Sequence, residues 1–111
     1  MPVTHDIIMI FCTTPSRAAA EQIAQTLVAK KLAACVNIVA GVESVYAWEG
    51  KIEQQQEFLL LVKTTAANYE RLEATILSLH PYDTPEIIAS PIQHGLTDYL
   101  TWVAASTGNS D

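Results

Sequence analysis

The order of strand and helix patterns along the 111 residues predicts an α+β fold. Two short apolar strands lie near the ends of the chain, at residues 6–13 and 86–90, and a long β-hairpin fills its middle. Amphipathic helical patterns separate these strands, and a third follows the last one. The order β-α-β-β-α-β plus a C-terminal helix predicts a ferredoxin-like sandwich, an antiparallel sheet with two helices on one face.

The first strand and the first helix follow each other directly. The run from Asp6 to Thr13 is apolar without alternation, which is typical of a strand buried on both faces. The following TPS predicts a helix start, with Thr14 as N-cap and Pro15 at the first helical position. Apolar residues then recur at helical spacing, and Lys30-Lys31 in the last turn suits the helix dipole.

The middle of the chain predicts a hairpin longer than most. β-Branched and aromatic residues without a helical stripe continue to Trp48, and KIEQQQEFLLLVKT returns as the third strand. Glu49-Gly50 between them is a two-residue turn signal, and Gly41 marks a bulge. The outer half of this hairpin should project beyond a small sheet and be stabilised by another chain.

The turn also predicts the register of the two strands. Pairing Trp48 with Lys51 places Tyr46 opposite Glu53. If no bulge intervenes, the same register places Cys35 opposite Thr64, at the far end of the ladder.

The second half of the chain repeats the helix-then-strand pattern. TTAANYERLEATILSL has a helical stripe, and His80-Pro81 ends it because proline cannot continue a helix. A short fourth strand runs from about Glu86 to Ser90, with Pro91 indicating an edge position. GLTDYLTWVAAS predicts the last helix, and residues 106–111 are expected to form a flexible tail.

The composition narrows the class of protein. The chain is half hydrophobic, so we expect one domain over residues 1–111. Only 16% of its residues are charged, below the roughly 25% of globular proteins, which favours self-association. A net charge of −6 without a basic run argues against nucleic acid as a partner. We expect neither a secretory leader nor membrane contact, hence a cytoplasmic protein with two reduced cysteines.

Five motifs in a fixed order carry a family resemblance. They are KLAACVNI (31–38), SVYAWEGKIE (44–53), EFLLLVKTT (57–65), HPYDTPEI (80–87) and TDYLTW (97–102). In order and spacing they resemble the CutA family of divalent-cation tolerance proteins over almost the whole chain. The resemblance implies a tight homotrimer of ferredoxin-like subunits whose long hairpins pair with adjacent subunits. It also implies a role in tolerance to copper and other divalent metals, copper binding and no settled enzymatic activity.

The resemblance implies Cys12 and His80 as copper ligands. Thiolate is a soft ligand for Cu(I), and imidazole suits Cu(II) or Zn²⁺. Both residues also have a structural interpretation, since free cysteine is commonly buried and a histidine in the last turn suits the helix dipole. Copper-binding relatives carry a second histidine where this chain has Leu79. We therefore expect weak copper binding, or ligands recruited across a subunit interface.

Other residues are candidates for a cleft or an interface. The cleft or second-shell candidates are Cys35, Glu57, Lys63, Tyr82 and Glu86. The expected trimer-interface residues are Tyr46, Trp48, Ile52 and Trp102, because aromatic residues dominate interface energetics. For Cys35 we favour a packing role beside two small alanines over a reactive or metal-binding thiol. No recognisable catalytic motif is present, so we predict that the protein is not an enzyme.

Three functions fit the sequence. The leading hypothesis is a non-enzymatic homotrimer that affects tolerance to divalent metals and binds copper or another divalent cation weakly. The second is a small-molecule signalling trimer that resembles the nitrogen-regulatory trimers, against which the two-residue connection at Glu49-Gly50 argues. The third is a purely structural or interaction trimer, which low charge and high apolarity support equally well.

Overall fold

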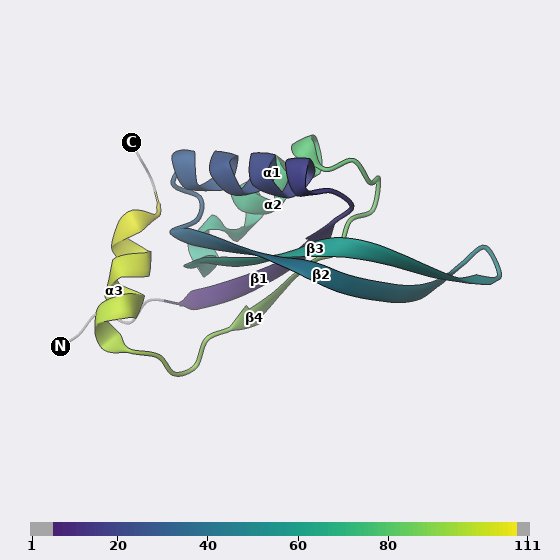
Figure 1. The fold of residues 1–111 in the computed structure, drawn as a ribbon. Helices are drawn as coiled ribbons and strands as arrows, with labels where there is room; N and C mark the ends of the chain where they lie inside the picture. Colours follow the sequence, from purple (N-terminus) through teal and green to yellow (C-terminus); the bar gives the residue numbers. More distant parts are fainter. Residues whose placement is uncertain (1–5, 109–111) are drawn as a thin grey trace.

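The computed structural model describes residues 6–108, and Figure 1 shows their arrangement. Residues 1–5 of the expected domain and 109–111 of the expected tail lie outside the described residues. The elements in chain order are β1 (Ile7–Thr14), α1 (Arg17–Ala29), β2 (Cys35–Trp48), β3 (Lys51–Thr65), a 3-10 turn (Ala66–Asn68), α2 (Tyr69–Leu79), β4 (Ile87–Pro91) and α3 (Thr97–Ser106). The predicted α+β class and order of elements are confirmed.

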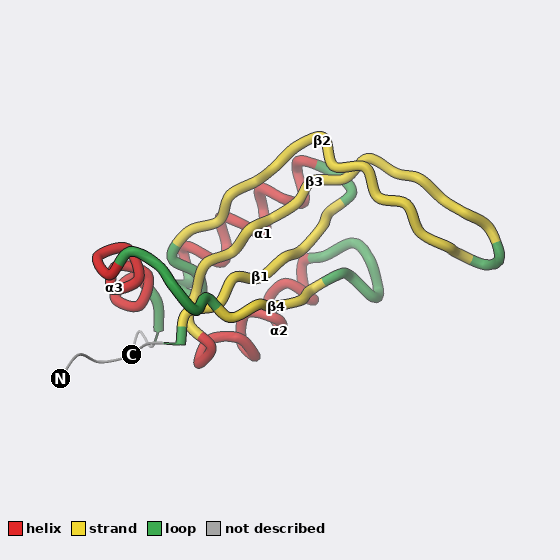
Figure 2. The backbone as a smooth tube through the Cα atoms, turned by 90° about the horizontal axis from the view of Figure 1, so that it is seen from below, coloured by secondary structure: helices red, strands yellow, loops and turns green. Residues whose placement is uncertain are grey.

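The strands form one antiparallel sheet in the order β2-β3-β1-β4. Both α1 and α2 lie on one face of this sheet, and α3 lies beside its end (Figure 1). Seen from below, the opposite face of the sheet lies in front of α1 and α2 (Figure 2). The short strand β4 is at an edge of the sheet and has only β1 as a neighbour. Proline lacks a backbone N–H and is tolerated at such an edge, which agrees with the position of Pro91.

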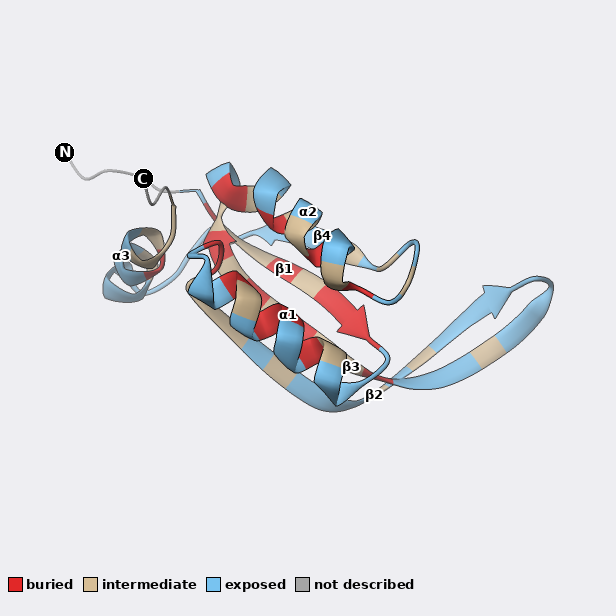
Figure 3. Ribbon diagram, turned by 90° about the horizontal axis from the view of Figure 1, so that it is seen from above, coloured by how far each residue is buried: buried red, intermediate tan, exposed pale blue. Residues whose placement is uncertain are grey.

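The hydrophobic core lies between the sheet and the two helices. Its members include Ile10 of β1 and Leu60 of β3, which are fully buried, and the inner faces of both helices are buried as well (Figure 3). The helical contribution comes from Ile23, Leu27, Leu72 and Ile76. Alternation along the strands therefore directs every second side chain toward the helices.

The opposite face of the sheet is also apolar. Directly paired residues share a face, and Phe11 pairs with both Leu61 and Ile88 on the side away from the core. Ile88 leaves 57% of its surface exposed. The strands thus carry apolar residues on both faces, as their sequence predicts, while α1 and α2 cover only one of them.

The hairpin extends far beyond the rest of the sheet. The β1 ladder ends at the pair Thr14 and Phe58, so residues 42–57, here called the arm, form a two-stranded ribbon that leaves the sheet (Figure 1). Glu49 and Gly50 both have positive φ angles, 51° and 80°, as a type I′ turn requires. The predicted turn is confirmed.

A bulge at the base of the arm changes the register. Trp48 pairs with Lys51 as predicted, but the ladder shifts by one residue between Val39 and Val42, where Gly41 has a φ of 80°. Beyond this bulge Cys35 lies opposite Lys63. The uninterrupted register, with Cys35 opposite Thr64, is therefore wrong, because the extra residue displaces all later pairs by one.

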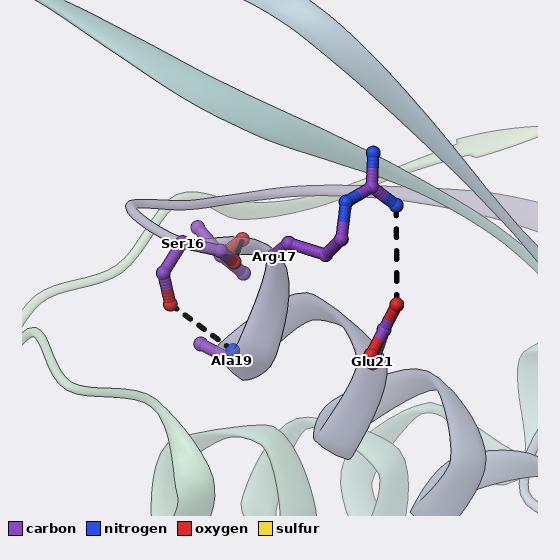
Figure 4. A network of polar contacts seen from close by, with 5 residues as sticks. Ser16, Arg17, Ala19 and Glu21 are labelled. Atoms are coloured by element: carbon purple, nitrogen blue, oxygen red, sulfur yellow. Dashed lines mark hydrogen bonds and ion pairs between the residues drawn. The ribbon is translucent and has the colours of Figure 1, made fainter.

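The first helix begins later than the sequence suggests. The N-cap is Ser16, whose hydroxyl oxygen accepts a hydrogen bond from the Ala19 amide at 3.1 Å, and Arg17 follows it and approaches Glu21 at 3.9 Å (Figure 4). Thr14 is not the cap, because its backbone still belongs to the β1 ladder. The helix also ends at Ala29, before the two lysines expected in its last turn.

Candidate functional site

Cys12 lies near the end of β1, with its side chain among the core residues. It is fully buried on the face of the sheet that packs against the helices. Burial, followed by the nearby negative charges of Glu86 and Glu57, raises the pKa of its thiol from 9.0 to about 12. The thiol is therefore protonated at neutral pH, whereas a metal ligand must be a thiolate.

His80 caps the C-terminal end of α2 and is only 8% exposed. Its Nε2 lies 2.8 Å from the Thr13 carbonyl oxygen, and its Nδ1 lies 3.1 Å from the Tyr82 backbone nitrogen. A carbonyl only accepts and an amide N–H only donates, so Nε2 carries the proton and Nδ1 is the acceptor. Both ring nitrogens are thus engaged, and metal binding through either one breaks a hydrogen bond.

Tyr82 connects this region to the base of the arm. Its hydroxyl donates to a carboxylate oxygen of Glu57 at 3.0 Å. Burial, followed by the hydrogen bond and charge of Glu57, raises the pKa of Tyr82 to about 12. Glu57 is only 6% exposed although it is a carboxylate, so this hydrogen bond satisfies a buried acceptor.

Two of the predicted cleft residues lie elsewhere. Cys35 and Lys63 are cross-strand partners, six residues of β3 away from Glu57, which is roughly 20 Å along an extended strand. The Lys63 ammonium group donates to the side-chain oxygen of Asn37 and to a backbone carbonyl at 3.3 Å. Burial and then the neighbouring Cys35 raise the pKa of Tyr99, which places this thiol beside α3. The candidates thus form two separate groups.

The expected interface residues are exposed in the single chain. Trp48 and Ile52, near the tip of the arm, expose 61% and 75% of their surface, and Tyr46 is also exposed. Trp102 on α3 is exposed too, and its ring lies 5.7 Å from that of Tyr99. Four large apolar or aromatic side chains therefore face solvent at two places on the chain.

No pattern in the sequence indicates which groups His80 contacts. The partners of His80 are the Thr13 carbonyl and the Tyr82 amide, and backbone groups carry no residue-specific signal. Nor does the sequence mark Gln55, whose side chain lies 3.4 Å from the Tyr82 hydroxyl, as a site residue. These contacts arise because the loop after α2 folds back against the arm and the end of β1.

Within residues 6–108, no three His, Cys, Asp or Glu side chains gather closely enough to hold a metal ion. A groove of about 590 Å³ lies between the start of β1, the end of β4 and α3, and none of the predicted site residues lines it. No helix within the same range is long and apolar enough to cross a membrane. The described part of a single chain therefore offers scattered donors and not a complete metal site.

The sequence matches the family model described as CutA1 divalent ion tolerance protein over residues 8–106. The chain belongs to the CutA1 family. A divalent-cation tolerance protein CutA of Thermus thermophilus is 47% identical over 100 residues, which are 90% of this chain and 97% of that protein. The match confirms the resemblance that the five motifs indicate.

Solved CutA structures share the fold. CutA1 from Oryza sativa superposes with a TM-score of 0.93 at 43% identity and covers 96% of this chain and 98% of its own. A protein described as the periplasmic divalent cation tolerance protein CutA from Archaeoglobus fulgidus gives a TM-score of 0.87 at 42% identity, with 90% and 97% coverage. The family and the relatives from Thermus thermophilus and Archaeoglobus fulgidus are named for tolerance of divalent ions, which is the general role that membership indicates.

Proposed function

We propose that the chain is a non-enzymatic, cytoplasmic homotrimer that acts in tolerance of divalent cations and binds copper, or another divalent cation such as Zn²⁺, weakly. Membership of the CutA1 family supports the role in cation tolerance. The strand order β2-β3-β1-β4, with two helices on one face, supports ferredoxin-like subunits.

The observation that carries the assembly is the apolar face of the sheet that α1 and α2 leave uncovered. Phe11, Leu61 and Ile88 meet on that face, and burying apolar surface there stabilises an oligomer by about 25 cal/mol per Å². The exposed arm, with Trp48 and Ile52, supplies the second contact. In the proposed trimer, neighbouring subunits bury both the apolar sheet face and the exposed side chains of the arm.

Analytical ultracentrifugation tests the assembly. We expect the mass of three chains for the wild type and a smaller species for Ile88→Asp, since a carboxylate on the uncovered sheet face opposes its burial. Val28→Asp is the matched control, because Val28 is an exposed apolar residue of α1, on the other side of the molecule. A wild type that sediments as one chain refutes the trimer.

The donors near β1 support weak metal binding. We place Cys12 and His80 nearest the metal, where His80 must release a hydrogen bond and Cys12 must lose its proton against a pKa of about 12. Each of these changes costs free energy, so binding is weaker than at a site whose imidazole nitrogen is free and whose thiol is already deprotonated. Glu57, Tyr82 and Glu86 are proposed to line a cleft between subunits, where the missing donors come from the adjacent chain.

Titration calorimetry with Cu(II) tests the metal site. We expect weak binding to the wild type, weaker binding to His80→Ala and Cys12→Ser, and unchanged binding to the control His94→Ala, since His94 is exposed and distant in sequence from both. If all three variants bind copper as the wild type does, the assigned ligands are wrong. If the wild-type trimer binds no divalent cation, the purely structural trimer is the better description.

A further inference from the structure

The arm has little support within its own chain. The β1 ladder stops at Phe58, so from Glu57 outward β3 pairs only with β2. A two-stranded ribbon is marginally stable by itself. The bulge beside Gly41 lies at the same point, opposite residues 57–59. Because a bulge bends its strand, the structure at the base of the arm sets the direction in which the arm leaves the sheet.

One loop contacts the arm at this base. The segment between α2 and β4 curves toward the place where β2 and β3 leave the sheet (Figures 1 and 2). The Tyr82 hydroxyl of this loop lies 3.0 Å from Glu57 and 3.4 Å from the Gln55 side chain. Among the side-chain hydrogen bonds of residues 6–108, these are the ones that join the arm to a residue outside it.

Tyr82 is itself held in place by His80. Its backbone N–H donates to His80 Nδ1, and the two rings lie 5.0 Å apart. The other ring nitrogen of His80 is bonded to the Thr13 carbonyl, near the end of β1. A continuous series of hydrogen bonds therefore runs from the central strand of the sheet through His80 and Tyr82 to the base of the arm.

We propose that this series, here called the latch (Thr13, His80, Tyr82 and Glu57), fixes the direction in which the arm leaves the sheet. The bond between Tyr82 and Glu57 is charge-assisted and partly shielded from water by the burial of Glu57, which strengthens it. The proposal rests on the proposed trimer in one respect: an arm of fixed direction is preorganised for pairing with a neighbouring subunit.

Tyr82→Phe tests the latch, because it removes the hydroxyl and keeps the ring. The matched control is Tyr69→Phe, which removes an equivalent bond to Glu73, at 2.9 Å, within α2. Amide hydrogen exchange of the assembled protein is read by mass spectrometry for the arm, with α1 as the internal reference for global opening. We expect the arm of Tyr82→Phe to exchange about tenfold faster than that of the wild type, which is the order expected for loss of a hydrogen bond to a charged group.

The conservative variant Glu57→Gln separates the bond from the charge. Its amide oxygen still accepts the Tyr82 proton, so we expect exchange of its arm to stay closer to the wild type than that of Tyr82→Phe. Unchanged arm exchange in Tyr82→Phe, or an equal rise in Tyr69→Phe, overturns the latch. Sedimentation as a single chain instead refutes the trimer alone, since arm exchange relative to the wild type still reports on the latch.

Discussion

Replacing His80 with alanine separates a structural role of this residue from a metal-binding role. The substitution removes the bond to the Thr13 carbonyl and the bond from the Tyr82 amide. Both partners stay within the folded chain, and the Thr13 side of the site is buried. If the imidazole is structural, the variant loses stability even when no metal is present.

The two lost hydrogen bonds decide the size of this effect. A buried group that loses a hydrogen-bond partner costs about 1–3 kcal/mol, and the Thr13 carbonyl, which still accepts from the Cys12 thiol at 3.8 Å, falls near the middle of that range. Tyr82 is only half-buried, so water can partly replace the lost bond of its amide. Loss of that bond should therefore cost a free energy near the lower limit of this range. We therefore expect His80→Ala to lower the free energy of unfolding by about 2–4 kcal/mol.

Urea denaturation in EDTA, at one fixed protein concentration, measures this loss. His94→Ala is the control, because His94 is exposed and its replacement should change the free energy of unfolding by less than about 0.5 kcal/mol. If His80→Ala is as stable as the wild type in EDTA but less stable than the wild type in copper, the structural role is refuted. His80 then acts mainly as a metal ligand.

Three further predictions concern the cysteines and the turn. At pH 8 iodoacetamide should label the half-buried Cys35 and leave Cys12 unlabelled until the protein unfolds, because Cys12 is buried and protonated; equal labelling contradicts this. As the pH rises from 9 toward 12, the unfolded Cys12 thiol ionises and the folded one does not, so stability should fall by up to about 1.4 kcal/mol per pH unit. Cys12→Ala should flatten that slope in urea titrations, and an unchanged slope places the alkaline loss elsewhere. Gly50→Ala should cost about 1 kcal/mol by the same assay, because φ is +80° although nothing lies within 4 Å of the added carbon, and a neutral result means that the turn relaxes.

Much of the fold follows from local patterns. Strand and helix periods along the chain predict the order of elements, and Glu49-Gly50 predicts the turn, because a type I′ turn needs residues that tolerate positive φ. Even Gly41 identifies the bulge. Combining the two gives the observed register, whereas a ladder without the bulge misplaces Cys35 by one residue. These features depend on neighbours in sequence, which is why sequence alone suffices.

The candidate site is different. Residue types at Cys12 and His80 suggest metal ligands, and five motifs indicate the CutA family, which the comparisons confirm. Sequence could not reveal that the thiol faces the core or that both imidazole nitrogens are bonded, since these facts depend on Thr13 and Tyr82 folding against them. Family membership, element order and the turn were therefore determined by the chain's own pattern. The chemical state of His80 and Cys12 was decided by tertiary packing, because burial and distant backbone partners, not residue type, control which protons and lone pairs are free.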